Sequence, residues 1–385
     1  MYRTSKITNN LLARIILHIF YLILIITGIY KKRPISDFIE SKKKEKGIQK
    51  IVVKDNKTVK SVDISVPRYK RIKKSPEHII IIDDDVGMFK DAIWKYGHYA
   101  IPWLKITDPD GGLELIYGLR DPNTQVLGVT IIMGVASTDV CVQAAKNILN
   151  ILNIKDVPVL RGARTPKDLG VETEAARFIV NTVMDNPGQV EIIATGPLTN
   201  IATAIMIEPE LPKYWHTLHF ATGEFRSALG EISDLYYPSL LGIPDLNINV
   251  DINATRYVLE HGEAFPIYPN EIMDDIILTR KDYNRIKNAG TKIGNYIAYE
   301  LKIHDFIFGI FGGMIPHGVV PIALALDPSY KCKTIESAIV MKNYGSQGYA
   351  FVLSNNPKLN KHKIYLRINE ADKGRIHQKL IERLI

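Results

Sequence analysis

The chain has 385 residues, of which 46% are hydrophobic and 23% are charged. This balance is close to that of an average globular protein, so it excludes a wholly disordered chain and a coiled coil. Two cysteines, Cys141 and Cys332, are too few for a disulfide framework or a cysteine-rich zinc site.

The net charge of +8 is unevenly distributed along the chain. Residues 1–75 hold 19 Lys and Arg against 5 Asp and Glu, and acidic residues outnumber basic ones in the remainder. The basic character therefore belongs to the N-terminal arm. This argues against a nucleic-acid-binding fold and for a basic tether beside a membrane.

An apolar stretch from Leu11 to Tyr30 is interrupted only by Arg14 and His18. From Ile15 to Tyr30 it runs for about 16 residues, just under the roughly 20 that a membrane-spanning helix needs, and basic residues flank it on both sides. No small-x-small cleavage site precedes those charges, which disfavours a cleavable signal peptide. A soluble core helix is the other alternative. We expect residues 1–30 to form a transmembrane signal anchor.

The charges around this stretch also predict its orientation. Seven Lys and Arg lie in residues 31–46, against three (Arg3, Lys6 and Arg14) before Ile15. The positive-inside tendency then places the C-terminal body in the cytoplasm of a single-pass membrane protein. Residues 31–75 are predicted to be a basic linker, with a possible hairpin around Asp55 and Asn56.

From residue 76 to 385 the pattern changes to apolar runs that alternate with helical periods. Four expected strands cover 78–82, 123–132, 157–160 and 189–195, with helices at 140–152, 172–184 and 198–206. This alternation predicts an α/β domain with a mostly parallel, doubly wound sheet flanked by helices. In such sheets ligands bind beyond the carboxyl ends of the strands.

Acidic residues follow the first expected strand. Asp83 and Asp85 are two residues apart, so in an extended chain their carboxylates point to the same side. Paired carboxylates at a strand end are typical of a hard divalent cation site. A solvated acidic turn is the alternative.

Three further features lie at the predicted rim. The Gly-Pro turn after Thr195 leaves the carbonyl of that residue free to face a ligand, and Thr199 or Asn200 is expected to cap the next helix. Alternation from Asp245 to Asp251 places Asp245 and Asn247 on one side of an extended segment, as a polar lining for a hydroxyl-rich ligand or as a polar strand edge. His317 precedes an apolar helix at 321–326.

Taken in order, these stretches resemble the inosine-uridine preferring nucleoside hydrolase family over most of the body. The most specific are GLELIYGLRDPNTQVLGVT (112–130), VPVLRGARTP (157–166), EIIATGPLTNIA (191–202), DLNINVDINA (245–254) and PHGVVPIALALDP (316–328). The resemblance implies hydrolysis of the N-glycosidic bond of ribonucleosides through a calcium-bound water, giving ribose and a free base. It also implies a possible homo-oligomer.

The resemblance assigns expected roles residue by residue. Asp85 would be the base and His317 the acid that protonates the leaving base. The Ca²⁺ ligands would be Asp83, Asp85, the Thr195 carbonyl and either Asp91 or Asp110, whereas the ribose would be held by Asp110, Asp245 and Asn247.

The chain also departs from the family pattern. About twenty inserted residues follow Gly87, so the second metal-binding carboxylate is either Asp91 or Asp110. With Asp110 in register, Gly111 stands where a further aspartate is expected. Val135 replaces a ribose-binding asparagine, and Gly318 replaces a metal-binding aspartate after the histidine. The His304-Asp305 pair falls in the middle of a helix and is interpreted as structural.

These departures leave two functions open. The first is a membrane-tethered nucleoside hydrolase. The second is a catalytically impaired relative that binds a nucleoside, ribose or a partner at a membrane. A third, weaker hypothesis is a glycosidase for another N-riboside, with inserted Trp94 and Trp103 stacking on its base.

Overall fold

The computed structural model describes residues 76–88, 109–223, 225, 245–308, 313–344 and 348–385. The expected anchor (1–30), the basic linker (31–75) and most of the insertion, with Asp91, Trp94 and Trp103, lie outside the described residues. Among the residues that the structure does describe, no helix combines the length and apolar character needed to cross a membrane.

The described strands form one sheet in the order β3-β2-β1-β4-β5-β6-β9-β7-β8. Every neighbouring pair from β3 through to β9 is parallel, and β7 runs antiparallel to both β9 and β8. The strands are β1 (His78–Asp84), β2 (Thr124–Ile131), β3 (Val159–Arg161), β4 (Glu191–Ala194), β5 (Thr217–Ala221), β6 (Pro266–Tyr268), β7 (Cys332–Asn343), β8 (Tyr349–Ser354) and β9 (His362–Ile368).

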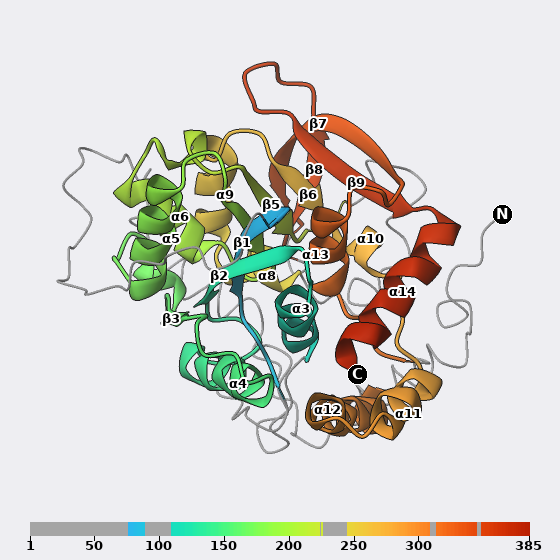
Figure 1. The fold of residues 1–385 in the computed structure, drawn as a ribbon. Helices are drawn as coiled ribbons and strands as arrows, with labels where there is room; N and C mark the ends of the chain where they lie inside the picture. Colours follow the sequence, from blue (N-terminus) through green and yellow to red (C-terminus); the bar gives the residue numbers. More distant parts are fainter. Residues whose placement is uncertain (1–75, 89–108, 224, 226–244, 309–312, 345–347) are drawn as a thin grey trace, which may run out of the picture.

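Helices cover both faces of this sheet (Figure 1). On one side lie α3 (Asp110–Leu119), α4 (Thr138–Ile151), α11 (Arg280–Asn288), α12 (Lys292–Phe308), α13 (Val319–Leu326) and α14 (Glu370–Leu384). On the other side lie α5 (Glu174–Asp185), α6 (Thr199–Ile207) and α9 (Ile252–His261). Two short helices, α8 (Leu246–Val250) and α10 (Asn270–Met273), complete the set used below.

Strand β1 shows why the sheet is buried on both faces. Ile80 and Ile82 pack into the core beneath α3, α4 and α13, whereas Ile79 and Ile81 pack into the core beneath α5 and α6. Successive side chains of a strand point to opposite faces, so an uninterrupted apolar run supplies both layers. The prediction of a mostly parallel, doubly wound α/β sheet is therefore confirmed.

The strand order creates a natural binding position. The chain builds β1, β2 and β3 outward, then returns to the other side of β1 with β4. The crevice at such a reversal point, beyond the carboxyl ends of the strands, is where ligands bind in doubly wound sheets. Here that point follows Asp84 of β1 and Ala194 of β4.

Two local predictions are wrong. The segment from Asp245 is not extended: the Asp245 carboxylate accepts a hydrogen bond from the Ile248 N–H (2.8 Å) and so caps α8. An acceptor three residues before a free N–H favours a helix start over a strand. Neither Thr199 nor Asn200 caps α6, because the Ncap residue is Leu198 and both polar side chains instead bond to distant elements.

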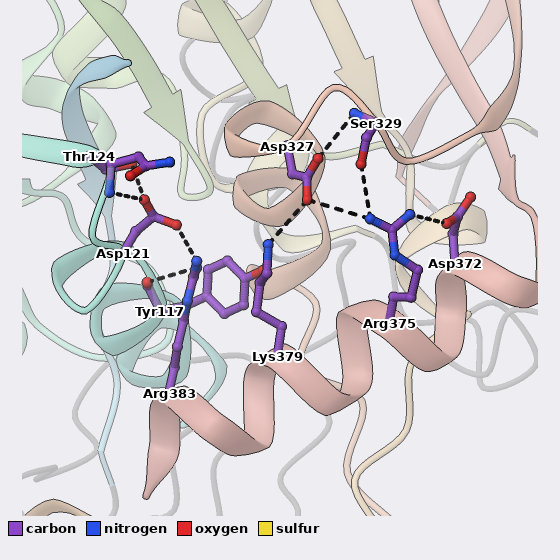
Figure 2. Close-up of polar contacts among 10 residues, drawn as sticks. Tyr117, Asp121, Thr124, Asp327, Ser329, Asp372, Arg375, Lys379 and Arg383 are labelled. Carbon is purple, nitrogen blue, oxygen red and sulfur yellow. Dashed lines mark hydrogen bonds and ion pairs between the residues drawn. The ribbon is translucent and has the colours of Figure 1, made fainter. Parts of the chain in front are cut away.

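Helix α14 fastens the far end of α3 to the body (Figure 2). The Arg383 guanidinium pairs with the Asp121 carboxylate, donates to the Tyr117 carbonyl (3.1 Å) and lies 3.8 Å from the centroid of the Tyr117 ring. Earlier in the same helix, Lys379 and Arg375 reach Asp327 at the end of α13. These contacts hold α3 and α13 together, and both helices begin at the carboxyl edge of the sheet.

Candidate functional site

Asp83 is the innermost acid of the rim and is fully buried. Its Oδ1 accepts hydrogen bonds from the Thr130 hydroxyl (2.6 Å) and the Asn200 amide (2.9 Å), whereas Oδ2 has no partner among the described residues. Burial, with a smaller contribution from the charge of Asp85, raises the pKa of Asp83 to about 7. The protein thus fixes Oδ1 of this carboxylate, whereas Oδ2 can still accept a further group.

Asp84 and Asp85 continue the acidic run and are also buried. The Val135 N–H donates to Asp85 Oδ2 (2.6 Å), but Asp84 Oδ2 has no partner among the described residues. Burial, opposed by the hydrogen bond from the Val135 N–H and assisted by the charge of Asp110, raises the pKa of Asp85 to about 6. Burial and then the charge of Asp85 raise the pKa of Asp84 well above its ordinary value.

Helix α3 brings two more acids to the rim from its first turns. Asp110 begins the helix and accepts from the Gly111 N–H (2.8 Å). Glu114 lies four residues on, so it falls on the same face of the helix. Glu114 is completely buried, and neither carboxylate oxygen has a hydrogen-bond partner within the described residues.

The electrostatics of Glu114 place it within this acidic cluster. Burial raises its pKa well above the ordinary value, and the charges of Asp84, Asp110 and Asp85 add to the rise. The Thr195 side chain lies close enough to lower the pKa of Glu114, although its hydroxyl forms no hydrogen bond of ordinary geometry in the described residues. Strand β1, helix α3 and the turn after β4 therefore converge on one buried acidic site.

The Thr195 carbonyl was predicted to face a ligand. In the structure it accepts a hydrogen bond from the Asn247 amide at 2.6 Å, and the same amide donates to the Ala221 carbonyl at 3.2 Å. Asn247 thereby joins the ends of β4 and β5. A carbonyl oxygen has two lone pairs, so one remains for another donor or a cation.

Asp245 lies at the same rim with both of its oxygens engaged. Besides the cap of α8, it accepts from the Thr222 hydroxyl (2.9 Å), the Gly223 N–H (3.3 Å) and the Asn270 amide (3.0 Å). These donors hold the loops after β5 and β6 against α8. Its predicted role in binding ribose stays a prediction.

His317 stands just before α13 and is partly exposed. Its Nε2 lies 3.3 Å from Asp274 Oδ1. Burial raises the pKa of Asp110 above its ordinary value, and the charge of His317 partly offsets this rise. His304 of α12 lies close enough to His317 to be affected by its charge. Burial, and to a smaller extent this charge, lower the pKa of His304 to about 4. A histidine in contact with a carboxylate at a site rim is suited to donate a proton.

The chemistry of these donors fits a hard divalent cation. Carboxylate, threonine and main-chain oxygens are the ligands that such ions prefer, and several buried carboxylate oxygens here have no partner in the described part of the chain. The side chains are not already gathered into a cage: within the described residues, no three His, Cys, Asp or Glu side chains form a metal-binding group. The chemical types of these donors therefore suit a hard divalent cation. Their positions in the described residues do not define how such an ion would be coordinated.

The structure brings most of the predicted site residues to one rim: Asp83, Asp85, Asp110, Thr195, Asn247, Asp245 and His317. Asp91 lies outside the described residues, so its predicted role remains open. Sequence interpretation missed Glu114, which reads as an ordinary residue of an apolar helix. It also missed Asn200, taken for a helix cap, and Asp274, whose contact with His317 no local pattern reveals.

Comparison with protein families gives a match to the model described as inosine-uridine preferring nucleoside hydrolase, over residues 106–378. Among curated relatives, a probable uridine nucleosidase 2 from Arabidopsis thaliana is 22% identical over 281 residues, covering 65% of this chain and 84% of the relative. A pyrimidine-specific ribonucleoside hydrolase from Escherichia coli O157:H7 is 24% identical over 253 residues, covering 57% of this chain and 75% of the relative.

Solved structures share the fold. A plant nucleoside hydrolase superposes with a TM-score of 0.62 at 20% identity, covering 80% of this chain and 99% of the other. A purine-preferring ribonucleoside hydrolase from Gardnerella vaginalis gives a TM-score of 0.61 at 17% identity, covering 80% of this chain and 98% of the other. At these identities the likeness establishes the architecture alone.

Proposed function

Because this chain belongs to the inosine-uridine preferring nucleoside hydrolase family, we propose that it hydrolyses the N-glycosidic bond of ribonucleosides to ribose and a free base. The observation that carries the proposal is the buried acidic rim at the reversal point of the sheet, where β1, α3 and the turn after β4 converge. Relatives named for uridine and pyrimidine nucleosides make uridine the first substrate to test.

The proposed roles follow from the position of each side chain. Asp85 is the base that takes a proton from the attacking water, and the Val135 N–H fixes one of its oxygens. The positive charge that develops on the ribose ring is stabilised by the neighbouring carboxylates. His317, held by Asp274, donates a proton to the departing base.

The remaining rim residues bind and orient the sugar. Asp110 faces the site from the first turn of α3 and is proposed to accept a ribose hydroxyl. Asn247 keeps its carbonyl oxygen for the same purpose while its amide ties down Thr195. Asp245 caps α8, the helix that carries Asn247. Its proposed role in ribose binding is therefore to hold Asn247 in position.

Ca²⁺ is the proposed cofactor, held by Asp83, Asp85 and the Thr195 carbonyl together with Asp91 or Asp110. When bound, such an ion raises the acidity of water and neutralises the acidic rim. Support comes from the donor chemistry and from the carboxylate oxygens that lack partners.

Incubation of the full chain with uridine, inosine, cytidine and adenosine, with and without calcium, tests the activity. Release of free base, measured by chromatography, is expected for at least one nucleoside and is expected to need the cation. No base from any of the four would overturn the hydrolytic proposal.

The alternative is a nucleoside-binding protein without hydrolysis. The observation in its favour is that Asp245 spends its oxygens on four protein donors rather than leaving one open. Calorimetry separates the two, because the alternative predicts binding of a nucleoside without base release.

We also propose that residues 11–30 anchor the protein in a membrane, with the catalytic body in the cytoplasm. The apolar run and the flanking basic residues support this. After alkaline carbonate extraction of cells that express the full chain, the protein is expected in the membrane pellet, and deletion of residues 1–30 is expected to release it. Assembly into a homo-oligomer is a further proposal, testable by light scattering.

A further inference from the structure

Two glycines at the rim are required by two carboxylates that pack against them. A Cβ atom built on Gly111 would lie 2.2 Å from Asp84 Oδ2, and one built on Gly318 would lie 2.3 Å from Glu114 Oε2. Real Cβ atoms essentially never approach a heavy atom to less than 3.0 Å. Positions 111 and 318 therefore cannot carry a side chain while Asp84 and Glu114 keep their places.

The two acids that pack against these glycines are among the least satisfied groups of the rim. Glu114 is 0% exposed with both oxygens unpartnered in the described residues, and Asp84 is 2% exposed with Oδ2 unpartnered. A buried charge without a partner is strongly unfavourable, so a folded protein pairs it, protonates it or binds a metal with it. No described cation pairs with either group.

The same replacement occurs at both glycines. The two positions at which the resemblance calls for a carboxylate carry glycine, and a carboxylate from another backbone position fills the volume next to each glycine. Asp84 reaches Gly111 from β1, and Glu114 reaches Gly318 from the second turn of α3. The number of carboxylates around the rim is thus preserved although their points of attachment differ.

From this juxtaposition we infer that Asp84 and Glu114 are cation ligands, in place of the carboxylates that positions 111 and 318 lack. The inference rests on the proposed function, because it concerns the cation of the same site. Its ligand class is a hard divalent ion bound by carboxylate oxygens, with calcium as the probe. The competing explanation is that both acids stay protonated and serve only as packing.

The test measures cation binding directly on the full chain. Calcium titrated into the wild type by calorimetry, and the calcium-induced rise in Tm, are compared with the Glu114→Gln and Asp84→Asn variants. Each variant keeps the size of the side chain and removes its charge, and ligand charge is one determinant of affinity. At least a tenfold loss of affinity is expected for each.

Glu172→Gln is the matched control. Glu172 is also a buried glutamate with one oxygen that lacks a described partner, but its other oxygen pairs with Arg177 of α5. The control is expected to bind calcium with wild-type affinity. Without calcium, Glu114→Gln is expected to melt at a higher temperature than the wild type, because glutamine has no ionised form whose burial would be penalised.

A reciprocal exchange gives the sharpest readout. Gly318→Asp alone is expected to lower Tm, since its side chain collides with Glu114. Combined with Glu114→Ala, the same substitution is expected to restore calcium binding above that of Glu114→Ala alone. Restoration supports the inference, and a double variant that binds no better than Glu114→Ala counts against it.

Base release from uridine is measured in parallel, so that the two proposals fail separately. If Glu114→Gln and Asp84→Asn bind calcium as tightly as the wild type, or if the wild type binds none, the ligand inference is overturned whatever the activity. If the wild type binds calcium through these residues but releases no base from any nucleoside, the ligand inference stands and the hydrolytic function fails.

Discussion

Buried acids have different surroundings at the amino ends and at the carboxyl ends of the neighbouring strands β1 and β4. At the amino end, Glu191 lies between His78 (2.8 Å) and His219 (3.1 Å). At the carboxyl end, Asp84 and Glu114 have oxygens without any described partner. Burial penalises charge at both ends, yet hydrogen bonds from the two histidines lower the pKa of Glu191 to about 2, whereas that of Asp83 is raised to about 7. The contrast separates a buried acid that neighbouring histidines pair from buried acids with oxygens that no described residue pairs.

Helix α3 repeats this contrast over its own length. In its first turns it carries Asp110 and Glu114 into the acidic rim. Just beyond its last turn, Asp121 is also buried but is paired with Arg383 (Figure 2). One helix therefore connects the acidic rim to a buried ion pair at its other end.

The largest expected effect comes from removing the proposed base. Asp85→Asn keeps an acceptor for the Val135 N–H but loses the carboxylate, so kcat for uridine is expected to fall by about 10²–10⁴-fold. Steady-state base release measures it. The control is Asp139→Asn on α4, where the acid is more than half exposed and pairs with Arg161, and it is expected to leave kcat unchanged. Wild-type kcat in Asp85→Asn would exclude this residue as the base.

Next in size is the ion pair at the other end of α3. Arg383→Ala leaves Asp121 buried without its cation and removes the contact with the Tyr117 ring, so the free energy of unfolding is expected to fall by about 3–5 kcal/mol. Urea denaturation measures the loss. Arg375→Ala, in the same helix but about half exposed, is the control and is expected to cost much less. Equal losses in the two variants would contradict the importance of burial.

The third prediction concerns pH at the amino end. The pKa of Glu191 is about 2 in the folded protein and about 4.5 unfolded, so its stabilising contribution is full above pH 4.5 and is lost as the pH falls toward 2. By that shift the contribution at neutral pH is roughly 3 kcal/mol. The Glu191→Gln variant is therefore expected to be less stable than the wild type at pH 6, with a difference that shrinks as the pH falls through this window.

His78 gives the same site a second window with the opposite sign. Its hydrogen bond to Glu191 raises its pKa above 6.5, so the contribution of the protonated imidazole is full below that value and is lost as the pH rises past it. Chemical denaturation from pH 2 to 8 resolves both windows. A stability difference between wild type and Glu191→Gln that does not vary with pH would refute the pairing.

Much of the fold is predictable from the sequence because its strands are uninterrupted apolar runs bounded by polar turns. The β1 prediction, residues 78–82, stops two residues short because Asp83 and Asp84 break the hydrophobic pattern while still pairing with β2. The site is less predictable. In the sequence, Glu114 resembles a solvent-facing residue of a helix. Its contact with Gly318 depends on tertiary packing, which no local spacing in the sequence encodes.

Asn200 illustrates the same limit from the opposite direction. Its position after a Gly-Pro turn favours a helix cap, yet its amide donates to Asp83 and its oxygen accepts from the Ala163 N–H at 3.0 Å. The amide also donates to the Ile131 carbonyl (3.3 Å), so Asn200 satisfies buried groups at the ends of three strands, and this outweighs a bond to one N–H of its own helix. Local capping preference is therefore a weaker guide wherever a buried carboxylate competes for the same side chain.

The smallest expected effect tests how firmly the protein holds Asp83, a rim acid with described hydrogen bonds to one of its two oxygens. Thr130→Val removes the hydroxyl that donates to Asp83 Oδ1 and leaves Asn200 as its remaining described donor, so a loss of about 1–2 kcal/mol in unfolding free energy is expected. Thr130→Ser keeps the hydroxyl and is expected to recover most of that loss. If valine and serine behave alike, the cost comes from packing rather than from the hydrogen bond. Asp83 would then resemble the unsatisfied acids of the rim more than it resembles Glu191.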